Sequence, residues 1–488
     1  MGSSREPDSI AETTPCPSNC ERVFCTVRTI SLRDGNGKAT PCVSLAAFSW
    51  LGQQLSTSAL MPGLHAVTFS DPNSNTVHMG LLPLILSPSV QSVTFDGSFI
   101  AADEFNRYAF PLVCKTIPNL QRLSLSDKSS LSNATIWQTF PVVAAELPLQ
   151  SLNISFPNAH MSDPKFLASL SRRFTELTSL TLDVHIPGHT PSEDMADMAD
   201  KPLLPNLAFL HLVNRSNCKL CKCYPAFLLR RVTVITFHFS EDVSDRDAFL
   251  DTVDTLADTP SLTKIYLNAD KKALIFEPSS LVPLLKRLNL EEFLINNSQS
   301  VLQNEGSRGG KSIQSIIGAA FTDRPEGHSP RLRVLSFPVT QRNPPVWDSD
   351  ESEWEDGGED PYPALATLCD LARYAKGLER ISLPINTSVV GYDGETVESL
   401  VRSWADAPDG PSKLRYLEIT ERRANTKAFV ASGYRDIATL LDTIFPHLQS
   451  VTVIDHPGRN SKWDADWELI EEHRRMRKAL RLCGVKHW

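Results

Sequence analysis

Apolar residues recur along this chain in one spacing, apolar-x-x-apolar-x-apolar, from near residue 27 to near residue 453. A representative copy is formed by Leu207, Leu210 and Leu212 within the run L-P-N-L-A-F-L-H-L. One copy alone would fit any half-buried strand, because alternate residues of a strand face opposite sides of its sheet. From Val90 to Leu290 the copies return about every 25 to 30 residues, which is inside the range of leucine-rich repeats. The pattern therefore predicts a stacked repeat architecture.

Each copy of the motif predicts a short strand with three buried positions. The predicted strands, named by those positions, are Val27/Ile30/Leu32, Leu64/Val67/Phe69, Val90/Val93/Phe95, Leu120/Leu123/Leu125, Leu149/Leu152/Ile154, Leu177/Leu180/Leu182, Leu207/Leu210/Leu212, Val232/Ile235/Phe237, Leu262/Ile265/Leu267, Leu290/Phe293/Ile295, Leu332/Leu335/Phe337, Leu378/Ile381/Leu383, Leu414/Leu417/Ile419 and Leu448/Val451/Val453.

The segments between these strands have apolar residues at helical spacing, as in Phe166–Phe174 and Asp245–Leu256. Many strands follow a proline turn such as Leu204-Pro-Asn206, where proline ends the helix and favours an extended chain. One unit of helix, turn and strand cannot bury its own apolar face, so neighbouring units must stack. The sequence thus predicts an α/β leucine-rich-repeat solenoid, with a curved parallel sheet on the concave side and helices on the convex side.

The expected domain organisation is one repeat domain preceded by a tail. Residues 1–24 are rich in Ser, Pro, Thr and Glu and are predicted to be disordered, and the solenoid is predicted over 25–488. An irregular insert is expected at about 297–331 and an acidic, solvated insert at about 344–361.

A capping helix is expected at about 464–483. Its apolar face, with Ile470 and Leu480, is predicted to cover the end of the stack. Its arginines, Arg474 among them, are predicted to form a solvated face.

Residues between the apolar positions of each motif are predicted to face the concave surface. Tyrosine, arginine and exposed aromatic side chains are the types that anchor protein interfaces. Because Phe209, His211, His238, Lys264 and Tyr266 belong to neighbouring repeats, we expect them to form one patch that binds a partner protein. The alternative is that this face carries only polar residues that a sheet tolerates. The full set of predicted partner-binding residues is Arg122, Phe209, His211, His238, Lys264, Tyr266, Arg380 and Tyr416.

Motifs for catalysis or cofactor binding are weak. Cys218, Cys221 and Cys223 are the best metal candidates, but tetrahedral zinc needs a fourth ligand and no second cysteine pair follows at zinc-finger spacing. The run Gly309-Gly-Lys-Ser312 resembles a phosphate-binding loop, yet Glu305 stands where that loop needs glycine. The sequence has no G-x-S-x-G or H-E-x-x-H motif. We therefore predict a protein that is not an enzyme and has no cofactor.

The net charge, the length of the apolar runs and the distribution of cysteines limit the classes of partner and the cellular compartment that we expect. The net charge is −9, which differs from the basic balance of general nucleic-acid binders. Apolar runs fall short of the ~20 residues of a membrane span, and no signal-peptide core is present. The ten cysteines are scattered, which fits free thiols in a reducing compartment. We expect a cytoplasmic or nuclear monomer that binds protein, without membrane or nucleic-acid partners.

The motifs Val27-Arg-Thr-Ile-Ser-Leu32, Leu120-Gln-Arg-Leu-Ser-Leu125 and Leu448-Gln-Ser-Val-Thr-Val453 resemble the repeat region of fungal F-box/leucine-rich-repeat proteins. In that family an F-box docks on an adaptor of a cullin-type ubiquitin ligase and the repeats hold the substrate. The resemblance implies a non-enzymatic protein-interaction scaffold that recognises a substrate for such a ligase. No F-box pattern precedes Val27. The alternatives are a structural repeat protein without an effector module and a zinc-stabilised binding protein.

Overall fold

The structure is a computed structural model of the chain. It describes residues 27–33, 50, 53, 61–71, 82–128, 134–160, 166–185, 204–215, 228–240, 246–269, 281–287, 289–296, 317–318, 320–321, 331–337, 363–391, 395–405, 411–421, 431–454 and 462–483. The chain divides into two compact units, Met1–Leu177 and Thr178–Trp488.

The first unit is a parallel sheet whose strands follow one another in chain order. Its strands are β1 (Thr29–Arg33), β2 (Ala66–Asp71), β3 (Ser92–Gly97), β4 (Arg122–Ser126) and β5 (Ser151–His160). Its helical elements are α3 (Leu82–Ile85), η2 (Ser98–Ala101), η3 (Phe105–Ala109), α4 (Phe110–Thr116), α5 (Ala134–Val143) and α6 (Phe166–Arg173).

Aromatic side chains fill the layer between the sheet and the helices of the first unit. Ring centroids lie 5.0 Å apart for Phe95 and Phe105, 5.9 Å for Phe105 and Phe110, and 5.7 Å for Phe110 and Phe140. All four rings are buried. Such contacts between aromatic rings add to the free energy of area burial, so this series of rings joins successive repeats into one core.

The second unit repeats the same plan over more strands. Its strands are β6 (Ser179–His185), β7 (Phe209–Asn214), β8 (Val234–Phe239), β9 (Lys264–Ala269), β10 (Glu292–Asn296), β11 (Val334–Ser336), β12 (Arg380–Ile385), β13 (Tyr416–Glu421) and β14 (Ser450–Val453). Its helices are α8 (Arg246–Ala257), α9 (Val282–Leu285), α11 (Ala366–Tyr374), α12 (Val397–Ala405), α13 (Ala431–Ile444) and α14 (Lys462–Leu482).

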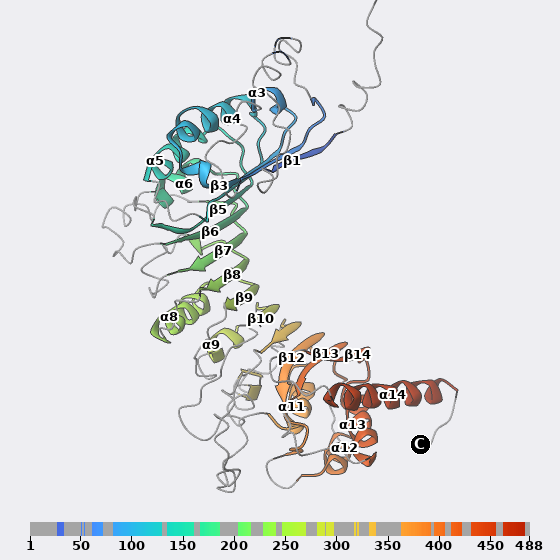
Figure 1. Ribbon diagram of the computed structural model, residues 1–488. Helices are drawn as coiled ribbons and strands as arrows, with labels where there is room; N and C mark the ends of the chain where they lie inside the picture. The colour runs from blue at the N-terminus through green and yellow to red at the C-terminus, as the bar shows by residue number, and fades with distance from the viewer. Residues whose placement is uncertain are drawn as a thin grey trace, which may run out of the picture. The chain divides into compact units, whose positions relative to one another are not determined.

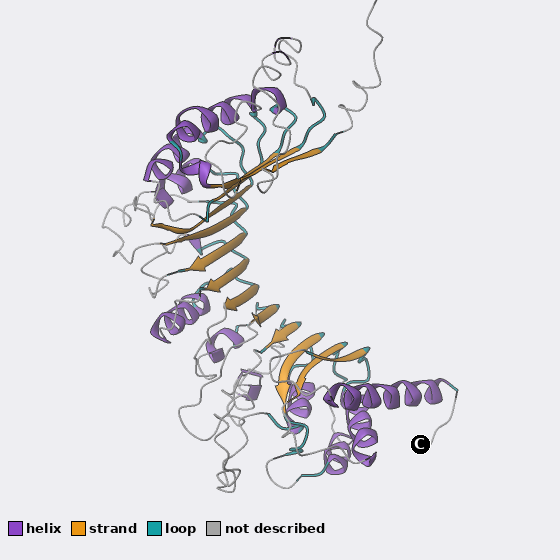
Figure 2. Ribbon diagram, viewed as in Figure 1, coloured by secondary structure: helices purple, strands orange, loops and turns teal. Residues whose placement is uncertain are grey.

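The predicted fold class is confirmed: the strands are parallel, in chain order, and the described helices lie along one face of the sheet within each unit (Figures 1 and 2). Neighbouring strands pair with equivalent motif positions in register, as in Leu210 with Ile235 and Ile235 with Ile265. These three side chains are at most 2% exposed. The opposite face, called the open face below, carries no helix among the described residues (Figure 2).

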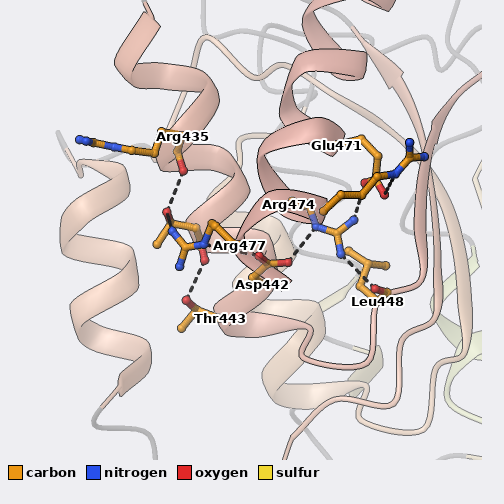
Figure 3. Close-up of polar contacts among 9 residues, drawn as sticks. Arg435, Asp442, Thr443, Leu448, Glu471, Arg474 and Arg477 are labelled. Carbon is orange, nitrogen blue, oxygen red and sulfur yellow. Dashed lines mark hydrogen bonds and ion pairs between the residues drawn. The ribbon is translucent and has the colours of Figure 1, made fainter. Parts of the chain in front are cut away.

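Helix α14 contradicts one expectation about its arginines. Arg474 is only 5% exposed, because it lies on the side of the helix that packs on α13. There it contacts Asp442, Glu471 and the carbonyl oxygen of Leu448 (Figure 3). A helical pattern separates charged from apolar residues, but it does not show that a neighbouring helix supplies a carboxylate for one arginine.

The tail at 1–24, the acidic insert at 344–361 and most of the insert at 297–331 lie outside the described residues.

Candidate functional site

The open face of the second unit is organised in two rows of side chains. The first row takes the first residue of each strand from β7 onward: Phe209, Val234, Lys264, Glu292, Val334, Arg380, Tyr416 and Ser450. The second row lies two residues later: His211, Thr236, Tyr266, Leu294, Ser336, Ser382, Glu418 and Thr452. The parallel register sets both rows, since equivalent residues of adjacent strands pair directly.

Two aromatic side chains of the first row project into solvent. Phe209 is 52% exposed and Tyr416 is 44% exposed. They lie six strand spacings apart, or about 29 Å along the sheet at ~4.8 Å per strand. Large exposed aromatic side chains on a rigid sheet are suited to anchoring a partner, because they lose little conformational entropy on binding.

Lys264 and Tyr266, both predicted partner-binding residues, share one carboxylate on the next strand. The Lys264 ammonium donates to Glu292 Oε1 at 2.5 Å, and the Tyr266 hydroxyl donates to Glu292 Oε2 at 2.6 Å. Burial alone would raise the pKa of Glu292, but these two hydrogen bonds, with the charges of Lys264 and Arg333, lower it overall. The same arrangement raises the pKa of Tyr266, first through burial and then through Glu292. The cluster is therefore fixed in position and its charges are neutralised within the chain.

A third predicted residue, Arg380, also has a partner within the sheet. Its guanidinium pairs with Glu418 on β13. One residue before the first row, Arg333 makes a two-pronged ion pair with Glu379, with N···O distances of 2.9 and 3.0 Å. Exposed pairs of this kind contribute at most ~1 kcal/mol to stability each. Their larger effect is to hold long side chains in fixed positions on the open face.

His211 and His238 approach each other across β7 and β8. Burial lowers the pKa of His211, the charge of His238 lowers it further, and Asp183 on β6 opposes both. His211 Nε2 is buried and has no hydrogen-bond partner among the described residues. Asp183 makes a two-pronged ion pair with Arg215, which follows β7. The histidine at the centre of this group is therefore neutral at neutral pH.

Of the eight predicted residues, the structure places five on adjacent strands, two as a pair on other strands of the same unit and one in the first unit. Phe209, His211, His238, Lys264 and Tyr266 lie on the adjacent strands β7, β8 and β9, as expected. Arg380 and Tyr416 pair directly with each other on β12 and β13. Arg122 is exposed but belongs to β4 of the first unit.

The sequence pattern did not single out three residues of this site: Glu292, Asp183 and Arg215. Glu292 occupies the same strand position as Lys264, so alignment of the repeats would have placed it on the open face. Its role as a shared acceptor depends on side-chain geometry that the spacing does not give. The ion pair of Asp183 with Arg215 joins residues far apart in the chain, so only the register reveals it.

Cys218, Cys221 and Cys223 lie outside the described residues. Within the part of the chain that the structure describes, no group of three or more His, Cys, Asp or Glu side chains is placed to hold a metal ion. Among those same residues, no helix is long and apolar enough to cross a membrane.

Comparison with known proteins gives only distant likenesses in fold. No protein-family model matches the chain, and no curated protein matches it either. Among solved structures, TLR13 in complex with a single-stranded RNA is similar at 13% identity and a TM-score of 0.35, covering 82% of this chain and 50% of that one. A protein of Bacteroides fragilis is similar at 14% identity and a TM-score of 0.29, covering 52% of this chain and 72% of that one. The chain thus spans about half the length of the TLR13 chain that it matches.

Proposed function

We propose that this protein is a non-enzymatic scaffold that binds a partner protein on the open face of its second unit. The observation that carries the proposal is the first row of that face, where Phe209 and Tyr416 are exposed on a sheet that no described helix covers on that side. Exposed aromatic residues on soluble proteins are enriched at interfaces, where each anchor contributes about 2 kcal/mol or more.

The charges between the two aromatic residues support the same proposal. Lys264 is paired with Glu292, and Arg380 is paired with Glu418, so most of the charge is balanced within the sheet. A partner that covers these pairs buries each charge together with its opposite charge. Burying an unpaired charge would be much more unfavourable in free energy. The paired side chains also set a fixed pattern of donors and acceptors that can discriminate between partners.

The test compares partner proteins recovered by affinity purification with the wild-type chain and with the double variant Phe209→Ala/Tyr416→Ala. Tyr108→Ala is the matched control, because Tyr108 is 72% exposed but lies on η3 of the first unit. A partner of the open face is recovered with wild type and control and lost with the double variant. Purified proteins should then show at least ~100-fold weaker binding for the double variant. Equal binding by all three chains would contradict the proposal.

A finer form of the proposal is substrate recognition for a cullin-type ubiquitin ligase in the cytoplasm or nucleus. Its support is the resemblance of motifs such as Leu120-Gln-Arg-Leu-Ser-Leu125 to fungal F-box/leucine-rich-repeat proteins. Purification under native conditions should then recover a cullin and its adaptor together with the substrate. Recovery of an open-face partner without either ligase component would exclude the finer form and leave the scaffold function standing.

A further inference from the structure

A row of polar residues runs along the amino ends of the last strands of the second unit. Arg333, Glu379, Arg415 and Gln449 each precede the first row of the open face by one residue. Their backbones are joined in series: the amide of Glu379 donates to Arg333 O at 2.7 Å, that of Arg415 to Glu379 O at 2.8 Å, and that of Gln449 to Arg415 O at 2.8 Å. This backbone ladder fixes the order and spacing of the four side chains.

A cavity of about 430 Å³ opens beside three of these side chains, Glu379, Arg415 and Gln449. It is lined by Glu379, Lys413, Arg415, His447 and Gln449. All five lining residues have a charged or polar side-chain end, and Lys413, Arg415, His447 and Gln449 are exposed. Such a site suits a charged group that keeps part of its hydration, rather than an apolar ligand.

The charges around this cavity are unbalanced in favour of cations. Arg333 occupies both oxygens of Glu379, and this contact is the main reason that the pKa of Glu379 is lowered. The charges of Arg415 and Lys413 lower it further. Neither Arg415 nor Lys413 forms an ion pair with a carboxylate among the described residues. Three cationic side chains, Arg333, Arg415 and Lys413, therefore surround one carboxylate. Both oxygens of that carboxylate already accept hydrogen bonds from Arg333.

Other acidic groups act on a different side of this cluster. The charges of Glu292, the first residue of β10, and of Glu291 just before it act on Arg333, and neither residue lines the cavity. At the opposite end, Gln449 contributes an amide that donates hydrogen bonds without charge. The cavity thus has surplus positive charge and neutral donors within a chain whose net charge is −9.

We propose that this cavity binds a carboxylate or phosphate group carried by a peptide segment of the partner protein. An arginine guanidinium matches both anions through two parallel hydrogen bonds, and a lysine adds a second positive charge. A peptide is favoured over a free ion because Arg415 directly precedes Tyr416, the first residue of β13 on the open face, so the two sites adjoin in the chain. In this respect the inference rests on the proposed function and specifies the chemistry of its partner.

The test measures fluorescence anisotropy of labelled peptides with the full chain. Three peptides of otherwise identical sequence carry glutamates, phosphoserines or glutamines at the same positions. The glutamate and phosphoserine peptides should bind, with affinity falling as salt rises, and the glutamine peptide should not. Equal binding of the glutamine peptide would overturn the proposal.

Two variants of the chain test whether the anionic peptides bind in the cavity. The double variant Lys413→Gln/Arg415→Gln should weaken binding at least ~10-fold, which corresponds to about 1.4 kcal/mol. Arg402→Gln is the control, because Arg402 is 75% exposed on α12 and pairs with Glu398 there. It should leave affinity unchanged. Unchanged affinity in the double variant would overturn the proposal.

The variant Glu379→Gln should change the affinity for anionic peptides in the opposite direction. It removes the carboxylate that competes for Arg333, so anionic peptides should bind several-fold more tightly. A variant that merely disturbed the fold would weaken binding instead. Weaker binding in Glu379→Gln would therefore count against the cavity as the anion site.

The outcomes separate this inference from the proposed function. Anionic peptides should bind Phe209→Ala normally, because Phe209 is remote from the cavity along the strand order. If a partner protein is lost on Phe209→Ala/Tyr416→Ala but unaffected by Lys413→Gln/Arg415→Gln, the scaffold function stands and the anion site is overturned. Tighter binding of a single-stranded oligonucleotide than of either anionic peptide, with the same dependence on Arg415, would overturn the assignment to a peptide.

Discussion

Replacing Arg474 with methionine should weaken the packing of helix α14 on helix α13. The Arg474 guanidinium donates to Asp442 Oδ1 at 2.9 Å, to Glu471 Oε2 at 2.5 Å and to the Leu448 carbonyl oxygen at 3.0 Å (Figure 3). Its side chain is 6% exposed, and those of both carboxylate partners are 12% exposed. Methionine keeps most of the length of the side chain but leaves these acceptors without the guanidinium.

The magnitude follows from the burial of the group. Removing one partner of a buried ion pair costs about 3–5 kcal/mol, because the other charge is left without compensation. Here Asp442 retains Arg477 at 3.6 Å and Glu471 retains Arg475 at 3.7 Å, so we expect the lower end, about 3 kcal/mol. The control Arg475→Met changes a neighbouring arginine of α14 that is 79% exposed. It should cost no more than about 0.5 kcal/mol.

Hydrogen exchange of the native chain is the suitable assay, because a repeat protein of this size need not unfold in one step. A loss of about 3 kcal/mol should speed exchange in α13 and α14 roughly 100-fold, since each 1.4 kcal/mol is a factor of ten. Neutralising the stranded acceptors in Arg474→Met/Asp442→Asn/Glu471→Gln should restore part of the protection. If Arg474→Met exchanges like Arg475→Met, the guanidinium does not hold the helix and the reasoning is wrong.

Three further predictions concern other buried or paired groups. Trp467→Phe should lower local stability by about 1–3 kcal/mol, because the indole N–H donates to the buried Glu421 at 3.0 Å. Hydrogen exchange in α14 measures this loss, and unchanged exchange would contradict the prediction. Burial raises the pKa of the Cys369 thiol to about 12, so alkylation followed by mass spectrometry should label the exposed Cys483 in the native chain and Cys369 only after denaturation; equal labelling would refute it. The pKa of Glu292 is lowered in the folded chain, so its ionised form stabilises the fold. This contribution to stability should be complete at pH values above the ordinary pKa of 4.5 and should be lost as the pH falls below it. Hydrogen exchange in β9 and β10 should therefore lose this pH dependence in Glu292→Gln.

The spacing of apolar residues was sufficient to predict the repeats, because each motif must bury three side chains and expose those between them. Leu207, Leu210 and Leu212 are each at most 2% exposed, while Phe209 between them is 52% exposed. The same alternation placed His211, Lys264 and Tyr266 on one face of neighbouring strands. The alternation of buried and exposed residues along each strand and the stacking of the repeats can therefore be predicted from a single sequence.

The sequence did not reveal which polar groups meet across the repeats. Lys264 and Tyr266 were predicted to bind a partner protein, and the sequence did not indicate that Glu292 on the next strand accepts a hydrogen bond from each. Arg474 looked like a solvated residue, yet packing of α14 on α13 buries it beside Asp442. Hydrophobic burial follows a period along the chain, so it can be read from the sequence. A hydrogen bond or an ion pair instead requires two side chains to meet within about 3 Å, and only the tertiary packing of separate repeats decides that.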